Sequence, residues 1–441
     1  MIIACAVCKA AHRFLRFFGK GATALPGKIA LFICPDLLER LAKDVNVIAV
    51  TGTNGKTTSA RMTETALRKA GLSVFSNKSG ANLREGITAE FVMNLDLLCK
   101  PKCDHAVIEC DEAAAKRVFA EVKPAVVLIT NLFKDQSDRY GDVKKPMEMI
   151  LEGLRKSPET VLAVNADCQL TSAIAERLKN KTVYFGLDGS KIKKPDASEE
   201  NRCVFCGEKL EYRTVTYSNL GEWHCQKCGR KRRTPQVRVR SVTDGKMLLE
   251  LNGGKRICDV ALPAVYNVYN AAGMIAAVTA AGIEAEYAIN AAESFECGFG
   301  RMESFPLGKK GAQMILVKNT AAVNQTLDYI KTVEGNKTVV FAQNANAGDG
   351  RDLSWLEDAD FEKLRRMKNI GRVIASGDCA EQMRRRLAEA GVQSELFDDY
   401  DKLICALEDE ESRIFFLPSY TAMLELRQKL VRKLGGKNFW E

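Results

Sequence analysis

The sequence predicts an α/β protein whose domains are built on parallel, doubly wound sheets. From residue 45 onward, runs of β-branched apolar residues alternate with amphipathic helical stretches, as in a parallel sheet covered by helices. A glycine-rich loop joins the first strand of this series to its first helix. The chain has 441 residues, more than one ordinary core needs, so we expect two or three domains.

The expected elements divide the chain into three parts. Residues 1–44 are expected to be a helical segment, 45–300 a nucleotide-binding domain interrupted by an insertion at 200–235, and 301–441 a smaller α/β domain. The stretch VRVRSVTDGKMLLEL (237–251) predicts a hairpin with an Asp-Gly turn. The other main elements are expected as strand 45–50, helix 58–70, strands 105–110, 125–130 and 161–165, helices 267–281 and 285–294, and strands 314–317, 338–342, 372–375 and 413–417.

Charge and hydropathy exclude several functional classes. The 65 basic and 56 acidic residues give a net charge of +9, which is mild for this length, and the short basic clusters are typical of solvated faces. We therefore expect no nucleic-acid partner. The N-terminal stretch MIIACAVCKAAHRFLRFF lacks both the apolar length of a spanning helix and a signal-peptide cleavage site. We expect a cytoplasmic protein, whose amphipathic N-terminal helix could rest on the inner face of the membrane.

The loop in VIAVTGTNGKTT (47–58) predicts a phosphate site. Backbone N–H groups of such a turn, followed by a helix N-terminus, attract phosphate oxygens. Lys56 would reach the β- and γ-phosphates of ATP and act in catalysis, and the Thr57 hydroxyl would hold Mg²⁺. An accidental glycine turn is the alternative, but strand, loop, Lys-Thr and helix occur in the required order. The predicted cradle consists of Gly52, Thr53, Asn54, Gly55, Lys56, Thr57 and Thr58.

Four of the fifteen cysteines have the spacing of a metal site. Cys203, Cys206, Cys225 and Cys228 form the pattern C-x2-C-x18-C-x2-C, in which two tight knuckles can surround Zn²⁺ with four thiolates. Four protein ligands close the coordination sphere, so the zinc is expected to be structural. A zinc ribbon can also bind nucleic acid or protein, but an insertion inside an ATP-binding domain more often serves to fold a loop.

Two of these stretches resemble the Mur ligase superfamily, which includes folylpolyglutamate synthase. TGTNGKTT (51–58) is similar to its phosphate-binding signature, and VIECDEA (107–113) to its second acidic motif. The resemblance implies a Mur-ligase-like P-loop domain that uses ATP to convert a carboxylate into an acyl phosphate, which an amine then attacks. It also implies that Glu109 binds Mg²⁺ together with Thr57. A surface or capping carboxylate is the structural alternative for Glu109.

Two further segments extend this resemblance. YNVYNAAGMIAA (266–277) is similar to the helix that contacts adenine, a role that falls to Asn267. GFGRMES (298–304) is similar to the end of the central domain, which implies that Arg301 contacts phosphate or ribose. The chain departs from the pattern at Tyr266, where the superfamily has His.

Within the superfamily, the four-cysteine insertion is typical of the MurT branch, whose members are subunits of lipid II isoglutaminyl synthase. The resemblance implies a central Mur-ligase-like domain with a zinc-ribbon insertion, followed by a smaller Rossmann-like domain. Similar segments span nearly the whole chain. They are ALPGKIAL (24–31), GANLREGI (80–87), TNLFKDQSDRYGD (130–142), LVKNTAAVNQ (316–325), GDGRDLSWLEDADFE (348–362) and LPSYTAMLELR (417–427).

The MurT resemblance implies amidation of the α-carboxylate of D-glutamate in lipid II, with ammonia from a GatD-like glutaminase in a heterodimer. None of the three histidines lies in a recognisable glutaminase motif, which also favours a separate ammonia source. Asp349 is implied to complete the partner's catalytic triad, although its Gly-Asp-Gly context alone favours a turn residue. The C-terminal domain departs from the family pattern at Ala345, Thr320, Cys379 and Gln382.

The residues themselves leave two other functions open. A Mur-type ligase could join an amino acid to a carboxylate substrate without any glutaminase. A nucleotide-gated binding module, with the zinc ribbon touching nucleic acid or protein, would form no acyl phosphate and would bind polyanions in a salt-sensitive way.

Overall fold

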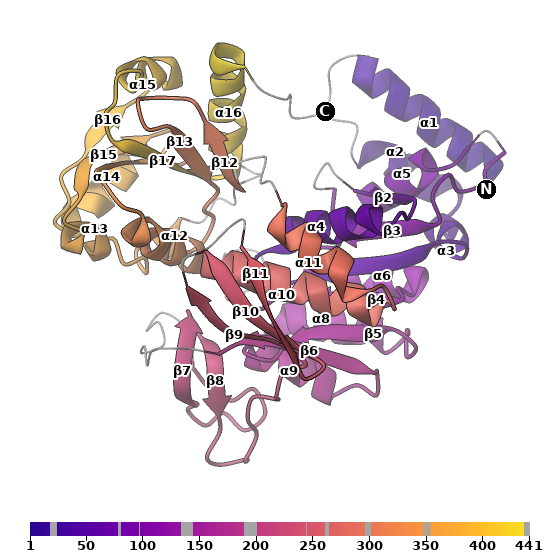
Figure 1. Ribbon diagram of the computed structural model, residues 1–441. Helices are drawn as coiled ribbons and strands as arrows, with labels where there is room; N and C mark the ends of the chain where they lie inside the picture. Colours follow the sequence, from indigo (N-terminus) through magenta and orange to yellow (C-terminus); the bar gives the residue numbers. More distant parts are fainter. Residues whose placement is uncertain are drawn as a thin grey trace. The chain divides into compact units, whose positions relative to one another are not determined.

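The computed structural model describes residues 1–17, 24–77, 81–96, 98–133, 144–188, 201–243, 245–260, 264–295, 301–346, 349 and 353–435. They form two compact units, one made of the described residues up to 295 and one of those from 301 onward. Each unit contains a sheet accompanied by helices (Figure 1), which confirms the predicted α/β class. The boundaries predicted at residues 44 and 300 stay predictions.

The first unit is built on one large, mainly parallel sheet. Its strands are β1 (Asn46–Thr51), β2 (Val74–Ser76), β3 (His105–Glu109), β4 (Val126–Ile129), β5 (Val161–Asn165), β6 (Thr182–Leu187), β7 (Glu211–Tyr217), β8 (Leu220–His224), β9 (Val237–Thr243), β10 (Lys246–Leu251) and β11 (Gly254–Asp259). The sheet has the order β11-β10-β9-β6-β5-β4-β1-β3-β2, while β7 and β8 form a separate ribbon. Strands β9, β10 and β11 are antiparallel, so the predicted hairpin over 237–251 is confirmed.

Helices connect and cover these strands. They are α1 (Ile2–Phe17), α2 (Leu25–Ile33), α3 (Leu37–Ala42), α4 (Lys56–Lys69), α5 (Arg84–Met93), α6 (Glu112–Val122), α8 (Lys144–Leu154), α9 (Gln169–Glu176), α10 (Val265–Ala280) and α11 (Ala285–Glu293). Helix α10 packs on β4, β5 and β6 and against α4 and α11. Among the described residues, no helix combines the length and apolar character needed to cross a bilayer.

The chain order creates a switch point at β1. From β1 the chain passes to β2 and β3 on one side, and then to β4, β5 and β6 on the other. The parallel pairing of β1 with both β3 and β4 brings the carboxyl ends of these strands to one edge. Ligands of open α/β sheets bind at such points, because the connections diverge there and leave a crevice. The predicted phosphate loop begins directly after β1.

The second unit is a smaller α/β sheet with its own core. Its elements are β12 (Arg301–Phe305), β13 (Ala312–Ile315), α12 (Thr320–Thr332), β14 (Lys337–Ala342), η1 (Ser354–Leu356), α13 (Glu362–Arg366), β15 (Ile370–Ser376), α14 (Ala380–Glu389), β16 (Glu395–Phe397), α15 (Tyr400–Ala406), β17 (Arg413–Pro418) and α16 (Tyr420–Leu434). The sheet order β12-β13-β17-β14-β15-β16 places a switch point between β14 and β17, as in Rossmann-like folds.

Candidate nucleotide site and four-cysteine centre

The glycine-rich loop between β1 and α4 needs glycine at two positions. Gly52 and Gly55 have φ values of 123° and 87°, which L side chains rarely adopt. A Cβ on Gly52 would lie 2.4 Å from Thr130 Oγ1, and one on Gly55 would lie 2.1 Å from Asn270 Oδ1. The two glycines therefore allow both the backbone turn and the close approach of β4 and α10 to the loop.

The end of β4 braces the loop through hydrogen bonds. The backbone N–H of Thr53 donates to the Asn131 carbonyl oxygen at 2.8 Å, and that of Asn54 donates to Asn131 Oδ1 at 3.0 Å. Thr130 Oγ1 and Asn131 Nδ2 both donate to the Asn54 carbonyl oxygen, at 2.7 Å and 3.0 Å. Sequence reasoning assigned no role to these two residues, although polar residues directly after a buried strand such as β4 are a usable signal.

Lys56 begins α4 and is nearly buried. Its Nζ donates to the Gly52 carbonyl oxygen at 2.5 Å and forms an ion pair with Glu112 Oε2 at 3.2 Å. The two side chains are only 10% and 7% exposed, so each charge needs the other as a partner. The first N–H groups of a helix have no intrahelical acceptor and favour anions, and this positive end lies beside Lys56. Glu112 is a further site residue that sequence reasoning missed.

Glu109 ends β3 and faces Thr57. Thr57 Oγ1 donates to Glu109 Oε2 at 2.7 Å. Asn77 holds the Glu109 backbone from both sides, donating to its carbonyl oxygen and accepting from its N–H at 2.8 Å each. Adjacent oxygen ligands of an octahedral Mg²⁺ lie about 3.0 Å apart, given metal–oxygen distances of about 2.1 Å. The two oxygens predicted to share Mg²⁺ therefore lie at a spacing that fits the ion.

The asparagines of α10 lie beside the loop. Asn267, predicted to contact adenine, is 2% exposed, and its Oδ1 accepts from Asn270 Nδ2 at 3.2 Å. Asn270 Oδ1 in turn accepts from Ser59 Oγ of α4 at 3.3 Å. The structure thus joins Asn267, through Asn270, to the first turn of α4, directly after the phosphate loop. Arg301 is the first residue of β12 in the second unit, and its side chain lies outside the described part of the chain.

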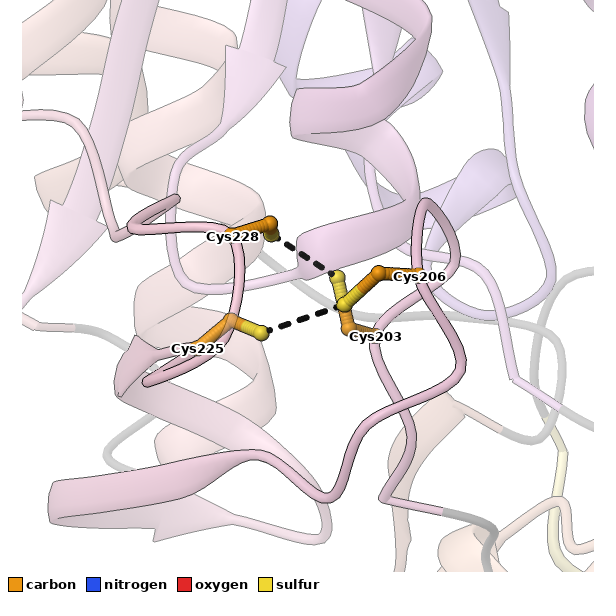
Figure 2. Close-up of side chains that lie close together, drawn as sticks. All are labelled: Cys203, Cys206, Cys225 and Cys228. Carbon is orange, nitrogen blue, oxygen red and sulfur yellow. Dashed lines mark hydrogen bonds between the residues drawn. The ribbon is translucent and has the colours of Figure 1, made fainter.

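The four predicted zinc ligands converge. The sulfur atoms of Cys203, Cys206, Cys225 and Cys228 all lie within 4.8 Å of one another. Figure 2 shows the two facing pairs, Cys203 with Cys228 at 3.6 Å and Cys206 with Cys225 at 3.4 Å. Four thiolates around a tetrahedral Zn²⁺ at about 2.3 Å lie about 3.8 Å apart. The cluster therefore has the ligand type and size for such an ion.

Each CxxC pair is a knuckle closed by backbone hydrogen bonds. The N–H of Gly207 donates to the Cys203 carbonyl oxygen at 2.8 Å, and the N–H of Gly229 donates to that of Cys225 at 3.0 Å. A backbone hydrogen bond from Arg230 lowers the pKa of the Cys228 thiol to about 6, whereas burial raises that of Cys203 to about 12. One ligand thus favours the thiolate without any metal.

A buried polar network ties the insertion to α10. Asp167 is fully buried between β5 and α9 and accepts from Arg232 Nε at 2.5 Å and from the Tyr269 hydroxyl at 2.6 Å. Arg232 lies four residues after the last cysteine, and Tyr269 lies next to Asn270 on α10. Burial raises the pKa of the Asp167 carboxyl although Arg232 is beside it. The hydrogen bonds from Arg232 and Tyr269 therefore offset the free-energy cost of burying the Asp167 carboxyl group.

Asp349 lies at the switch point of the second unit. Its Oδ1 accepts from the backbone N–H of Thr421 at 2.6 Å, and its Oδ2 accepts from Thr421 Oγ1 at 2.5 Å and from the N–H of Asn346 at 3.1 Å. Thr421 is in the first turn of α16, so the carboxylate caps that helix. Burial, together with Asp378 and Asp349, raises the pKa of the nearby Glu425. The carboxylate of Asp349 is thus fixed in a region rich in acidic groups.

Comparisons with known proteins agree with this geometry. Family models described as the Mur ligase middle domain and the MurT ligase C-terminal region match residues 50–278 and 316–423. The lipid II isoglutaminyl synthase (glutamine-hydrolyzing) subunit MurT of Staphylococcus aureus strain COL is 33% identical over 435 residues, 98% of both chains. The subunit of the same name from Streptococcus pneumoniae strain ATCC BAA-255 / R6 is 32% identical over 437 residues, 96% of both chains.

Solved structures share the fold. A pseudomurein peptide ligase type C from Methanothermus fervidus superposes with a TM-score of 0.67 at 21% identity, covering 90% of this chain and 80% of that one. This likeness confirms the predicted Mur-ligase-like fold. The sequence similarity to the two MurT subunits extends over nearly the full length of this chain and of each subunit. The chain belongs to the MurT family of Mur-type ligases.

Proposed function

We propose that this chain is the synthase subunit of a glutamine-hydrolysing amidotransferase acting on lipid II. It would convert the α-carboxylate of D-glutamate in the stem peptide to the amide of D-isoglutamine, with hydrolysis of ATP. The observation that carries this proposal is sequence similarity, at 33% and 32% identity over nearly the full length, to subunits named for this reaction. We expect the chain to meet this substrate at the inner face of the membrane.

The loop after β1 would bind the triphosphate. Lys56 would leave Glu112 for the β- and γ-phosphates, because a phosphate carries more charge than the carboxylate that it replaces as partner. Thr57 and Glu109 would hold Mg²⁺, which supplies positive charge to the transferring phosphoryl group. We assign Gly52 to Thr58 as the cradle, Asn267 to adenine and Arg301 to phosphate or ribose.

The chemistry requires two displacements. A carboxylate oxygen of the substrate attacks the γ-phosphorus, the bond to the β,γ-bridging oxygen breaks, and ADP leaves. Ammonia then attacks the acyl carbon, inorganic phosphate leaves with the oxygen that received the phosphoryl group, and the amine loses a proton. Lys56 lowers the barrier to the first step because negative charge builds on the γ-phosphoryl oxygens.

A glutaminase partner, GatD-like by family, would supply the ammonia. We propose that Asp349 orients the catalytic His of that partner by accepting a hydrogen bond, as in a Ser-His-Asp or Cys-His-Asp arrangement. The bonds from Thr421 and Asn346 would hold the carboxylate for this task. Asp349→Asn should therefore abolish glutamine hydrolysis by the complex, while ATP-dependent amidation with added ammonium persists. Loss of both activities would mean that Asp349 only caps α16.

The test is an assay of the chain co-purified with its glutaminase, with lipid II, ATP, Mg²⁺ and glutamine. We expect one amidation of the substrate by mass spectrometry, dependent on ATP, Mg²⁺ and glutamine. Amide formation with an amino acid in the absence of glutaminase would instead support a Mur-type ligase that adds amino acids. Nucleotide binding without any product, together with salt-sensitive binding of polyanions, would support the binding-module alternative.

We propose that the four cysteines hold a structural Zn²⁺. Cys228→Ser should remove the zinc measured in the purified chain and lower its melting temperature, because a metal that binds only the folded state stabilises it. Cys405→Ser is the matched control, since Cys405 is exposed and lies outside the cluster. A chain that contains no zinc when purified from zinc-supplemented medium would contradict the assignment.

A further inference from the structure

The outward side of α1 is apolar. Ala4, Cys5 and Cys8 are buried, whereas large apolar side chains on the other side are exposed. Ile3, Phe14 and Phe17 are 71%, 63% and 86% exposed, and the exposed positions 3, 6, 10, 14 and 17 recur at helical spacing. A helix at the surface of a globular protein normally shows polar residues on this side.

Helix α2 adds to this apolar surface. It packs against α1 (Figure 1), and its exposed positions include Leu25, 51% exposed, and Phe32, 90% exposed. On its other side Gly27 lies so close to α5 that an added Cβ would be 1.8 Å from the Glu85 carbonyl oxygen. Lys9 Nζ fixes α1 by donating to the carbonyl oxygens of Leu95 and Asp96 at 2.9 Å and 3.0 Å. We call the exposed large apolar side chains of α1 and α2 the N-terminal apolar face; they are Ile2, Ile3, Phe14, Phe17, Leu25, Phe32 and Ile33.

The two helices that form this face carry charge of one sign. Residues 1–35 contain no Asp or Glu and five basic residues, namely Lys9, Arg13, Arg16, Lys20 and Lys28. Exposed Arg13 and Arg16 alternate with Phe14 and Phe17, the pattern of helices that lie in a lipid–water interface. Two copies of this chain would bring like charges together, whereas anionic lipid head groups complement them.

We propose that the N-terminal apolar face docks on an anionic lipid bilayer, with α1 lying parallel to the surface and its phenylalanines among the acyl chains. This proposal rests on the proposed function. Docking would hold the first unit beside a substrate that is itself anchored in the membrane. Binding would combine buried apolar area with attraction between the arginines and the head groups, so it should weaken as salt is added.

The experiment is co-sedimentation of the chain, in complex with its glutaminase, with vesicles. Vesicles of phosphatidylglycerol and phosphatidylcholine should bind the complex, and vesicles of phosphatidylcholine alone should bind it at least about fivefold more weakly. Phe14→Ser with Phe17→Ser should lower binding by about tenfold or more, because both side chains would leave the acyl layer. Ile257→Ser, at an exposed apolar residue of β11, should leave binding unchanged.

A matched pair of charge variants tests the electrostatic contribution to vesicle binding. Arg13→Gln should weaken binding to the anionic vesicles by about fivefold, whereas Arg213→Gln, the same charge change on β7, should not. Equal binding by the Phe14/Phe17 variant and the parent chain would overturn the proposal. So would a change in heteromer formation or in self-association caused by that variant, because the face would then be a protein interface.

Activity separates this proposal from the proposed function. The Phe14/Phe17 variant should amidate a detergent-dispersed substrate with a shortened lipid at the parental rate, and lose activity only on substrate in vesicles. If the parent chain fails to amidate the dispersed substrate, the proposed function fails while the vesicle results still decide the docking face.

Discussion

Glu109, the proposed Mg²⁺ ligand, is held by hydrogen bonds to its backbone as well as its side chain. Asn77 bonds both its N–H and its carbonyl oxygen, so the carboxylate beside Thr57 has little freedom to move. Glu109→Gln keeps the shape but removes the charge that a divalent cation needs. We expect turnover to fall by about a hundredfold or more, together with the Mg²⁺ dependence of nucleotide binding. Glu152→Gln, at a side chain of α8 that is 43% exposed, should change neither; equal activity in both variants would exclude Glu109 as a metal ligand.

Gly55 can be tested against a glycine with the same backbone strain. Gly55 and Gly71 have φ values of 87° and 78°, but only Gly55 has a neighbour, Asn270, in the space of a Cβ. Gly71→Ala should therefore cost about 1–2 kcal/mol in free energy of unfolding. Gly55→Ala should cost more and also weaken ATP binding measured by calorimetry. Equal effects of the two substitutions would mean that the contact between the loop and α10 contributes neither to stability nor to ATP binding.

At the scale of elements, α10 connects the phosphate loop to the cysteine insertion. Tyr269→Phe removes a donor from buried Asp167, which should cost about 1–3 kcal/mol in free energy of unfolding and speed the loss of the proposed zinc ion to a chelator. Tyr329→Phe is the control, because its hydroxyl donates to the neutral Gln313 side chain at 3.1 Å in the second unit. Faster zinc loss in the control as well, or in neither variant, would contradict the coupling.

The long buried strands and the helices between them could be predicted from the sequence. β1, β3, β4 and β5 are continuous apolar runs, and their positions were predicted to within about a residue or two. The predictions did not include β2, which is three residues long, or β6, whose first half is only partly buried. Short or half-buried strands depend on neighbours that only the folded sheet supplies.

The same limit applies to the site. Gly52, Lys56 and the four cysteines belong to local patterns, in which the chemistry fixes the spacing along the chain. The partners Glu112 and Asn131 lie 56 residues from Lys56 and 77 residues from Asn54. Pairings at such separations come from the strand order at the switch point, which local spacing does not contain.

In the complete synthase, the proposed function places ammonia supply and carboxylate activation on two separate chains. The chain without its glutaminase should therefore amidate lipid II when ammonium chloride is added at a pH near 9, where a larger share of the ammonium is free ammonia. Glutamine should not replace ammonium until the partner is added. Amidation from glutamine by the chain alone, measured by mass spectrometry, would contradict the division of roles.

In the proposed reaction, the terminal phosphoryl group of ATP passes to the substrate carboxyl group in the cradle around Lys56. This transfer is tested most directly with lipid II carrying ¹⁸O at both oxygens of the α-carboxylate of D-glutamate. We expect one ¹⁸O in the inorganic phosphate released with each amide formed, because the phosphate leaves with the carboxylate oxygen to which it was transferred. Amide formation that releases only unlabelled phosphate would contradict it.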